Sequence, residues 1–345
     1  MTSKASLKIE ENYSLKNYNT FGLDAKAKYF VEIESVESLL DLISSDLFKK
    51  EKHLILGGGS NVLLTQDYDG LVIKISISGL SIEKEDNAYV WLKAMAGNVW
   101  HEVVMYSIEE GYGGLENLSL IPGQVGAAPM QNIGAYGIEL EAVFDHLEAV
   151  EISTGNIKKF YKDDCDFGYR ESVFKNIHKG RYIIVSVVLK LKKTQEEVSV
   201  SYGAIQSVLE EKGVDQPNAK LVSDAVIEIR QSKLPNPKEL GNAGSFFKNP
   251  VIEFKQLETL VEKYPEIPRY DVGNGMFKVP AGWLIEQCGW KGKKVGNVGA
   301  HKNQALVLVN YGGATGEEVK ALAMDIQKSV FQKFGIAISP EVNII

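Results

Sequence analysis

The chain has 345 residues, of which 44% are hydrophobic and 24% charged, with 32 glycines and 10 prolines. These values are ordinary for a globular protein, so a disordered, collagen-like or low-complexity chain is excluded, and the length predicts two or three domains. The 45 acidic residues outnumber the 38 basic ones, which gives a net charge of −7. Because no long basic run breaks this acidic background, we expect no binding to nucleic acid.

Cysteine and histidine spacing gives no sign of a disulfide framework or a metal site. Cys165 and Cys288 lie far apart without a CxxC pair, and the five histidines show no HxxxH spacing. Residues 1–11 lack the apolar core of a signal peptide, and the longest apolar stretch, residues 182–189, is far shorter than the ~20 residues that span a bilayer. We therefore expect a cytoplasmic protein that holds no metal and does not enter a membrane.

Hydrophobic periodicity predicts alternating strands and helices. Ser35 is expected to cap a helix with an apolar face, and residues 100–110 are expected to form another. The last helix has the clearest signals, because Thr315 and Glu318 form a capping box and Gly335 follows the apolar stripe. Strands are expected at residues 29–33, 53–56, 71–75, 88–94, 143–152 and 181–192.

Two glycine-rich segments are candidates for ligand contact. Gly57-Gly-Gly-Ser-Asn61 directly follows a predicted strand, and small residues at such a point let main-chain N–H groups converge on phosphate oxygens. The segment is neither GxGxxG nor a P-loop, and a tight turn is the plain alternative. Residues 111–137 hold seven glycines and almost no charge, which indicates backbone packed against something flat or bulky rather than a solvated linker.

Three further segments each contain one polar side chain that could carry chemistry. Arg170 stands among aromatic residues, which can present a guanidinium to a carboxylate, although a surface turn is the alternative. Ser245 lies between small residues and two phenylalanines without the GxSxG pattern of a hydrolase, so a structural loop is its alternative. Glu341 follows a proline near the chain end, and its spacing alone indicates no function.

Eight motifs taken in order resemble the UDP-N-acetylenolpyruvoylglucosamine reductase family, also called UDP-N-acetylmuramate dehydrogenase. Eight ordered motifs at family-like spacing are far more specific than any one of them. Ser201-Tyr-Gly203 also resembles the tyrosine-containing loop of the longer type in this family, although the chain ends at Ile345, where longer members can continue. The motifs are residues 19–22, 56–63, 114–123, 131–137, 167–170, 244–250, 281–286 and 340–342.

The resemblance implies an α+β chain in two domains. Residues 23–194 would form an FAD-binding fold of the vanillyl-alcohol-oxidase (PCMH) type in two subdomains, and residues 195–345 a smaller α+β substrate-binding domain. That FAD fold holds the pyrophosphate with a different glycine loop, which explains the missing GxGxxG. Noncovalent FAD is the implied cofactor, NADPH the hydride donor, and a monomer is expected. The implied cofactor-binding residues are Gly57, Gly58, Gly59, Ser60, Asn61, Val62, Ile121, Pro122, Gly123, Gly126, Ala127, Gln131, Asn132, Gly134, Ala135 and Tyr136.

The implied reaction reduces UDP-N-acetyl-3-O-(1-carboxyvinyl)glucosamine to UDP-N-acetylmuramate, a step in peptidoglycan precursor synthesis. Arg170 would pair with the enolpyruvyl carboxylate as charge develops, and Glu341 would assist at the carboxylate or enol. Ser245 would protonate the carbon that bore the charge. The implied substrate-binding residues are Tyr202, Lys233, Asn249 and Gln304.

Two other functions stay open at this point. Another FAD-linked oxidase of the same fold would pass its electrons to oxygen, and such enzymes often tether flavin through His or Cys, which the glycine loop lacks. A non-catalytic nucleotide-sugar-binding protein would keep the fold without the reaction. The three catalytic positions all carry competent residue types, which favours the reductase over both.

Overall fold

The computed structural model describes residues 7–345, and the chain divides into two compact units. The first unit comprises the residues up to Tyr13, Ala27–Gly58 and Asp69–Arg230. The second comprises Ser14–Lys26, Gly59–Tyr68 and Gln231–Ile345. Most of the segment assessed for a leader peptide lies outside the described residues. The domain boundary expected near residue 195 stays a prediction.

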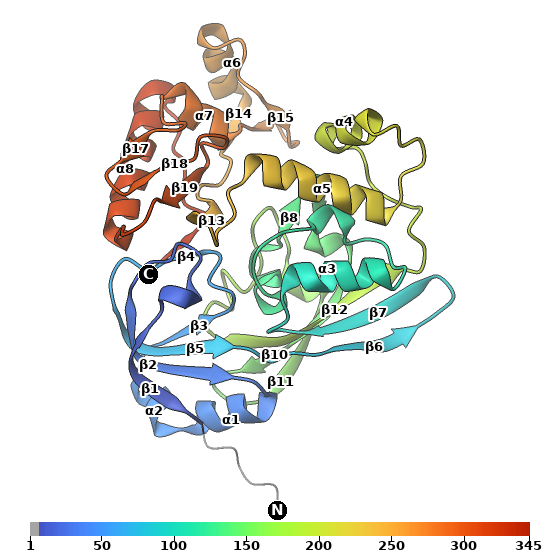
Figure 1. Cartoon of the computed structure of the whole chain (residues 1–345), viewed down its shortest axis with the longest axis vertical. Helices are drawn as coiled ribbons and strands as arrows, with labels where there is room; N and C mark the ends of the chain where they lie inside the picture. Colours follow the sequence, from blue (N-terminus) through green and yellow to red (C-terminus); the bar gives the residue numbers. More distant parts are fainter. Residues whose placement is uncertain (1–6) are drawn as a thin grey trace, which may run out of the picture. The chain divides into compact units, whose positions relative to one another are not determined.

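The first sheet of the first unit has the order β1-β2-β5-β3 and is covered by two helices (Figure 1). Strands β3 and β5 run parallel, with His53 opposite Leu71. Helices α1 and α2 bury Leu39, Leu42 and Phe48 in the same core as β2 and β5. The bounds are β1 (Ile9–Ser14), β2 (Lys26–Ile33), α1 (Val36–Ser44), α2 (Asp46–Lys50), β3 (His53–Leu56) and β5 (Tyr68–Ile75).

The second sheet of this unit is antiparallel throughout, with the order β11-β10-β12-β7-β6. Helix α3 buries Trp100, Val103 and Val104 in a core shared with β7, β10 and β12. Helices α4 and α5 form a smaller core of their own, to which Tyr136 adds its ring. The bounds are β6 (Leu80–Glu85), β7 (Tyr89–Met95), α3 (Trp100–Glu109), β10 (Phe144–Glu151), β11 (Ile157–Tyr161), β12 (Tyr182–Lys192), α4 (Gly203–Glu211) and α5 (Ala219–Lys233).

The second unit combines a four-stranded sheet, β13-β19-β18-β17, with a three-stranded sheet, β14-β16-β15. Helices α7 and α8 bury their apolar faces in one core with β18 and β19. The C-terminal strand β20 pairs in parallel with β4, so the chain end is built into this unit. The bounds are β4 (Val62–Leu63), β13 (Gly241–Ser245), β14 (Val251–Glu253), α6 (Phe254–Lys263), β15 (Tyr270–Asp271), β16 (Met276–Lys278), α7 (Ala281–Gln287), β17 (Lys294–Val295), β18 (Val298–Ala300), β19 (Val307–Asn310), α8 (Gly316–Phe334) and β20 (Asn343–Ile344).

The elements predicted from periodicity are present in the structure. Ser35 caps α1 by accepting the Ser38 N–H at 3.1 Å. Helix α8 has the predicted capping box and ends at Gly335, whose φ of +65° is the left-handed conformation that glycine adopts readily. Within residues 7–345, none of the helices combines the length and apolar character needed to cross a bilayer.

The α8 capping box makes a testable contribution to stability. Thr315 Oγ1 accepts the Glu318 N–H at 3.2 Å, and Glu318 Oε2 accepts the Thr315 N–H at 2.7 Å. Thr315→Ala removes the first bond and is expected to lower the free energy of unfolding by about 1 kcal/mol, measured by urea denaturation followed by circular dichroism. Ser329→Ala, in the middle of the same helix, is the control, and an equal loss in both variants would contradict the assignment.

Candidate functional site

In the first unit, Gly58 and Gly126 lie in close contact with the backbone or Cβ of other residues. A Cβ on Gly58 would lie 3.1 Å from the Cα of Gly123, and one on Gly126 would lie 2.6 Å from the Cβ of Ala96. Side chains at these positions would therefore push the segments apart. The sequence predicted backbone packed against something flat in residues 111–137, and part of that packing is against the chain itself.

Main-chain and side-chain bonds fix the segment around Gly123 to the turn before α3. The Gly123 carbonyl accepts the Trp100 N–H at 3.0 Å, and Gly126 N–H donates to the Ala96 carbonyl at 2.9 Å. Gln124 Nε2 donates to the Gly97 carbonyl at 2.7 Å, while its Oε1 accepts from Lys74 Nζ at 3.1 Å. Burial lowers the pKa of Lys74. Lys74 and Gln124 were not predicted as site residues, although a lysine inside an apolar strand was a readable signal.

Arg170 and the predicted residues 131–136 are brought together in the first unit. Strands β8 (Gly134–Ala135) and β9 (Ile138–Glu139) form a short hairpin. Arg170 Nη2 donates to the Gly134 carbonyl at 2.8 Å, and the φ of Arg170 is +56°. The buried Asn132 donates to Glu139 Oε2 at 2.9 Å and to the Gly168 carbonyl at 3.3 Å, so it joins the hairpin to the loop that carries Arg170.

Ser245 and Glu341 are brought together in the second unit. Ser245 ends β13 opposite Val307, and Phe246 and Phe247 behind it are fully buried. The Glu341 N–H donates to the Phe246 carbonyl at 2.8 Å, so the two predicted catalytic residues lie on segments joined one residue from Ser245. The structure thus places Glu341 near Ser245, which its spacing in the sequence did not indicate.

The second half of the glycine loop is bound to the same chain end. A Cβ on Gly59 would lie 2.0 Å from the Tyr18 carbonyl oxygen, and its φ is +63°, so only glycine fits. Asn61 Nδ2 donates to the Glu341 carbonyl at 3.4 Å, and the Asn61 carbonyl accepts the Asn343 N–H at 3.1 Å. Residues 59–62 and the segment 341–343 are therefore joined by hydrogen bonds.

The predicted substrate residues lie at separate places within their units. Tyr202 is 47% exposed before α4, and Lys233 is exposed at the end of α5. Asn249 Oδ1 accepts the Ala281 N–H at 2.9 Å at the start of α7. Gln304 Oε1 accepts the Leu306 N–H at 3.4 Å.

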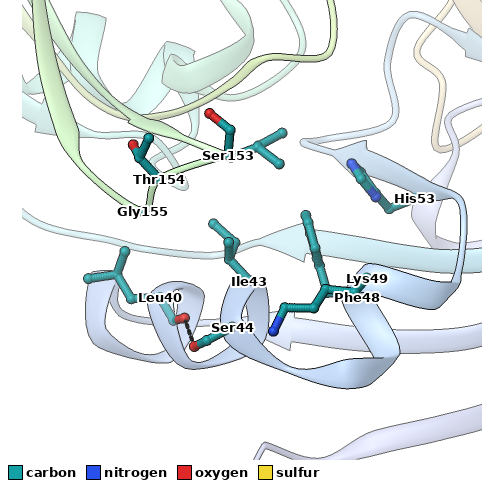
Figure 2. A pocket seen from close by; sticks show the side chains of 10 residues that line it. Leu40, Ile43, Ser44, Phe48, Lys49, His53, Ser153, Thr154 and Gly155 are labelled. Atoms are coloured by element: carbon teal, nitrogen blue, oxygen red, sulfur yellow. Dashed lines mark hydrogen bonds between the residues drawn. The ribbon is translucent and has the colours of Figure 1, made fainter.

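A cavity of about 750 Å³ in the first unit contains none of the predicted site residues. Figure 2 shows Leu40 and Ile43 of α1 and Phe48 of α2 facing the turn at Gly155. The His53 ring stacks on Phe48 with 4.3 Å between centroids, and Ser44, Lys49, Ser153 and Thr154 add polar groups to the lining. Within residues 7–345, no group of three or more His, Cys, Asp or Glu side chains is arranged to hold a metal ion.

The residues of the glycine segments suit FAD. At Gly58 the backbone lies against that of Gly123, and a backbone without a side chain can approach a pyrophosphate closely. Residues 27–159 match the FAD binding domain family. The chain is therefore an FAD-dependent oxidoreductase, and the expected α+β fold with a PCMH-type FAD domain is confirmed.

Relatives define the family within this class. Residues 236–345 match the C-terminal domain of UDP-N-acetylenolpyruvoylglucosamine reductase. The proteins of that name from Flavobacterium johnsoniae and Chromobacterium violaceum are 53% and 45% identical to this chain, covering 98% and 99% of it and 100% of each relative. The chain belongs to the UDP-N-acetylenolpyruvoylglucosamine reductase family.

Solved structures agree on the fold. The crystal structure of UDP-N-acetylenolpyruvylglucosamine reductase from Thermus caldophilus matches with a TM-score of 0.67 at 22% identity, over 98% of both chains. A solvent-stable cholesterol oxidase matches with a TM-score of 0.50 at 12% identity, over 99% of this chain and 88% of the oxidase. At such identities these two likenesses concern the fold alone.

The glycine packing predicts the effect of a side chain in the loop. Gly58→Val would force the two segments apart at Gly123, and we expect purified protein with little bound FAD, measured by the ratio of absorbance at 450 and 280 nm. Gly111→Ala is the control, because its φ of +82° is strained but a Cβ there meets nothing within 4 Å. Full FAD content in Gly58→Val would count against the assignment of this loop.

Proposed function

We propose that this chain catalyses the NADPH-dependent, FAD-mediated reduction of UDP-N-acetyl-3-O-(1-carboxyvinyl)glucosamine to UDP-N-acetylmuramate. The observation that supports this best is the main-chain bond from Glu341 to Phe246, the residue after Ser245, in a chain 53% identical to a reductase of this name over 98% of its length. A cytoplasmic monomer is part of the proposal. Both Cys165 and Cys288 are free thiols, as expected in a reducing compartment.

The cofactor part of the proposal concerns residues 57–62 and 121–136. These residues would hold FAD noncovalently, since no Cys or His is present in either segment to form a covalent link. Bound FAD would carry hydride from NADPH to the methylene carbon of the enolpyruvyl group. Backbone N–H groups at the glycines would hold the pyrophosphate, which needs donors that approach closely without side chains in between.

Three side chains would act on the substrate. An enol ether is electron-rich, so it accepts hydride only when charge flows towards its carboxylate; Arg170 would pair with that carboxylate and bind it more strongly as charge develops. Ser245 Oγ would give its proton to the carbon that joins the ether oxygen and the carboxylate, which completes the lactyl group. Glu341 would bind at the carboxylate or enol as its protonated form or through a neighbour, because two bare carboxylates repel.

Four side chains would bind the diphosphate. Lys233 would supply the positive charge, and Tyr202 and Asn249 would supply hydrogen-bond donors. Gln304 would add a polar contact beside them. Lys233, Tyr202 and Asn249 match family positions, and Gln304 is the weaker candidate. The side chains of Lys233 and Tyr202 are exposed, so a ligand can reach them.

The role of Ser245 can be tested by separating the two half-reactions. Reduction of the flavin by NADPH needs no proton donor at the substrate, so Ser245→Ala should leave this step nearly intact. Reoxidation by the enolpyruvyl substrate should slow by ~10²-fold or more if Ser245 is the general acid, and Ser245→Cys should recover part of the loss. Rapid mixing without air, followed at 450 nm, resolves both steps.

Two outcomes of this experiment would count against the proposal. Equal slowing of both steps in Ser245→Ala would make the residue structural, since Phe246 and Phe247 anchor the same loop. Wild-type flavin that is reoxidised by oxygen but not by the enolpyruvyl substrate would indicate an oxidase of the same fold instead.

A further inference from the structure

A second guanidinium, which no sequence motif singled out, lies beside Arg170 in the first unit. Arg230 is near the end of α5, and its side chain forms a hydrogen bond with the phenol of Tyr136. Arg170 is close enough to repel its positive charge. Burial is the main influence on Arg230 and lowers its pKa, while the nearby Tyr136 opposes this shift.

Tyr136 stands at the strained tip of the β8–β9 hairpin. Ala135 pairs with Ile138, so Tyr136 and Gly137 form a two-residue loop, and their φ angles are +51° and +84°. Two positive φ angles are typical of a type I′ turn, which favours Asn or Gly at the first position because a larger side chain is strained there. Such strain persists where the surroundings hold the residue firmly, often at a functional site.

Several contacts hold this tip within the first unit. Asn117 Nδ2 donates to the carbonyls of Tyr136 and Ser199, at 3.2 and 3.0 Å. The Tyr136 ring meets the Tyr202 ring edge-on, with 5.2 Å between centroids. Arg230 interacts with the phenol of Tyr136, and the Tyr136 ring contacts Tyr202. Tyr136 is predicted to bind the cofactor and Tyr202 the substrate, so the Tyr136 side chain links the two predicted roles.

The Glu139 side chain lies near Arg170, but no carboxylate in the described part of the chain influences the charge of Arg230. Within residues 7–345, the buried Nε of Arg230 has no hydrogen-bond partner, and the charge is influenced by Tyr136 and Arg170 but by no carboxylate. A buried cation without a counter-ion is unfavourable. An anionic ligand beside Arg170 would supply the missing negative charge.

We propose that Arg230 is a positioning residue for the reaction proposed above, on which this inference rests: it fixes the phenol of Tyr136 at the hairpin tip and, with Arg170, attracts an anionic group of the substrate. That group is the enolpyruvyl carboxylate or the diphosphate. By fixing the Tyr136 phenol, Arg230 also keeps the Tyr136 ring against the Tyr202 ring. Its positive charge adds to the binding of the anion.

Binding to the oxidised holoenzyme without NADPH tests this role, because no turnover occurs. We expect Arg230→Met to weaken binding of the enolpyruvyl substrate, measured by calorimetry, about tenfold or more, and Arg230→Lys to restore part of it. UDP-N-acetylglucosamine, which lacks the carboxylate, separates the two anions: its binding weakens equally if Arg230 serves the diphosphate and stays unchanged if it serves the carboxylate. Arg181→Met is the control, since the Arg181 side chain is 57% exposed.

The coupling to Tyr136 is tested by a double-mutant cycle. If Arg230 holds the phenol, Tyr136→Phe weakens substrate binding in the wild-type background but by less than twofold in Arg230→Met. If the losses of binding free energy in Arg230→Met and Tyr136→Phe add fully in the double variant, the coupling is overturned. If Arg230→Met binds the substrate as tightly as Arg181→Met, the whole inference is overturned. If Arg230→Met loses FAD or melts early, Tyr136→Phe decides, because unchanged binding in it contradicts the proposal. A wild-type enzyme that fails to bind the substrate would instead count against the proposed function.

Discussion

Close approach between backbones without side chains is the constraint on which the rest of the structure depends. Gly58 meets Gly123, Gly126 meets Ala96, and Gly59 meets the Tyr18 carbonyl, each at a distance that a Cβ would violate or strain. Backbone without side chains also suits close contact with a pyrophosphate, which is the role proposed for Gly57, Gly58 and Gly123. The proposed contacts would also account for the missing GxGxxG motif, since their donors would come from two segments far apart in the sequence.

Within the second unit, hydrogen bonds join residues 59–62 to the segment of Glu341 and that segment to the residue after Ser245. Asn61 binds the Glu341 carbonyl, and Glu341 in turn donates its N–H to Phe246, next to Ser245. A displacement of residues 341–343 would therefore shift both Asn61 in the glycine loop and Phe246 next to Ser245, the predicted proton donor. In the first unit, Arg170 and Arg230 hold the β8–β9 hairpin at its backbone and at its tip, so positive charge is fixed together with the strained Tyr136.

Much of the fold could be predicted, because its signals are local. Ser35, the Thr315–Glu318 capping box and the strand patterns each gave an element that the structure contains. The family and its FAD domain followed from ordered motifs and are confirmed, whereas the role of each site residue stays a prediction. Glu341 had no local signal, because its position comes from a main-chain bond to a residue about a hundred positions away. Arg230 was missed for a similar reason: its partners are in a hairpin near residue 136, and only a charged residue among the buried positions of α5 hinted at it.

The central claim is that one flavin in this chain accepts electrons from NADPH and gives them to an enolpyruvyl sugar nucleotide. The most direct measurement is the visible absorption spectrum of the purified full-length protein without air, with NADPH added first and the enolpyruvyl substrate second. We expect a yellow protein that is bleached by NADPH and regains its colour with one equivalent of substrate, with UDP-N-acetylmuramate as product. A protein that regains its colour only on admission of air, or a colourless protein that does not take up FAD, would contradict the claim.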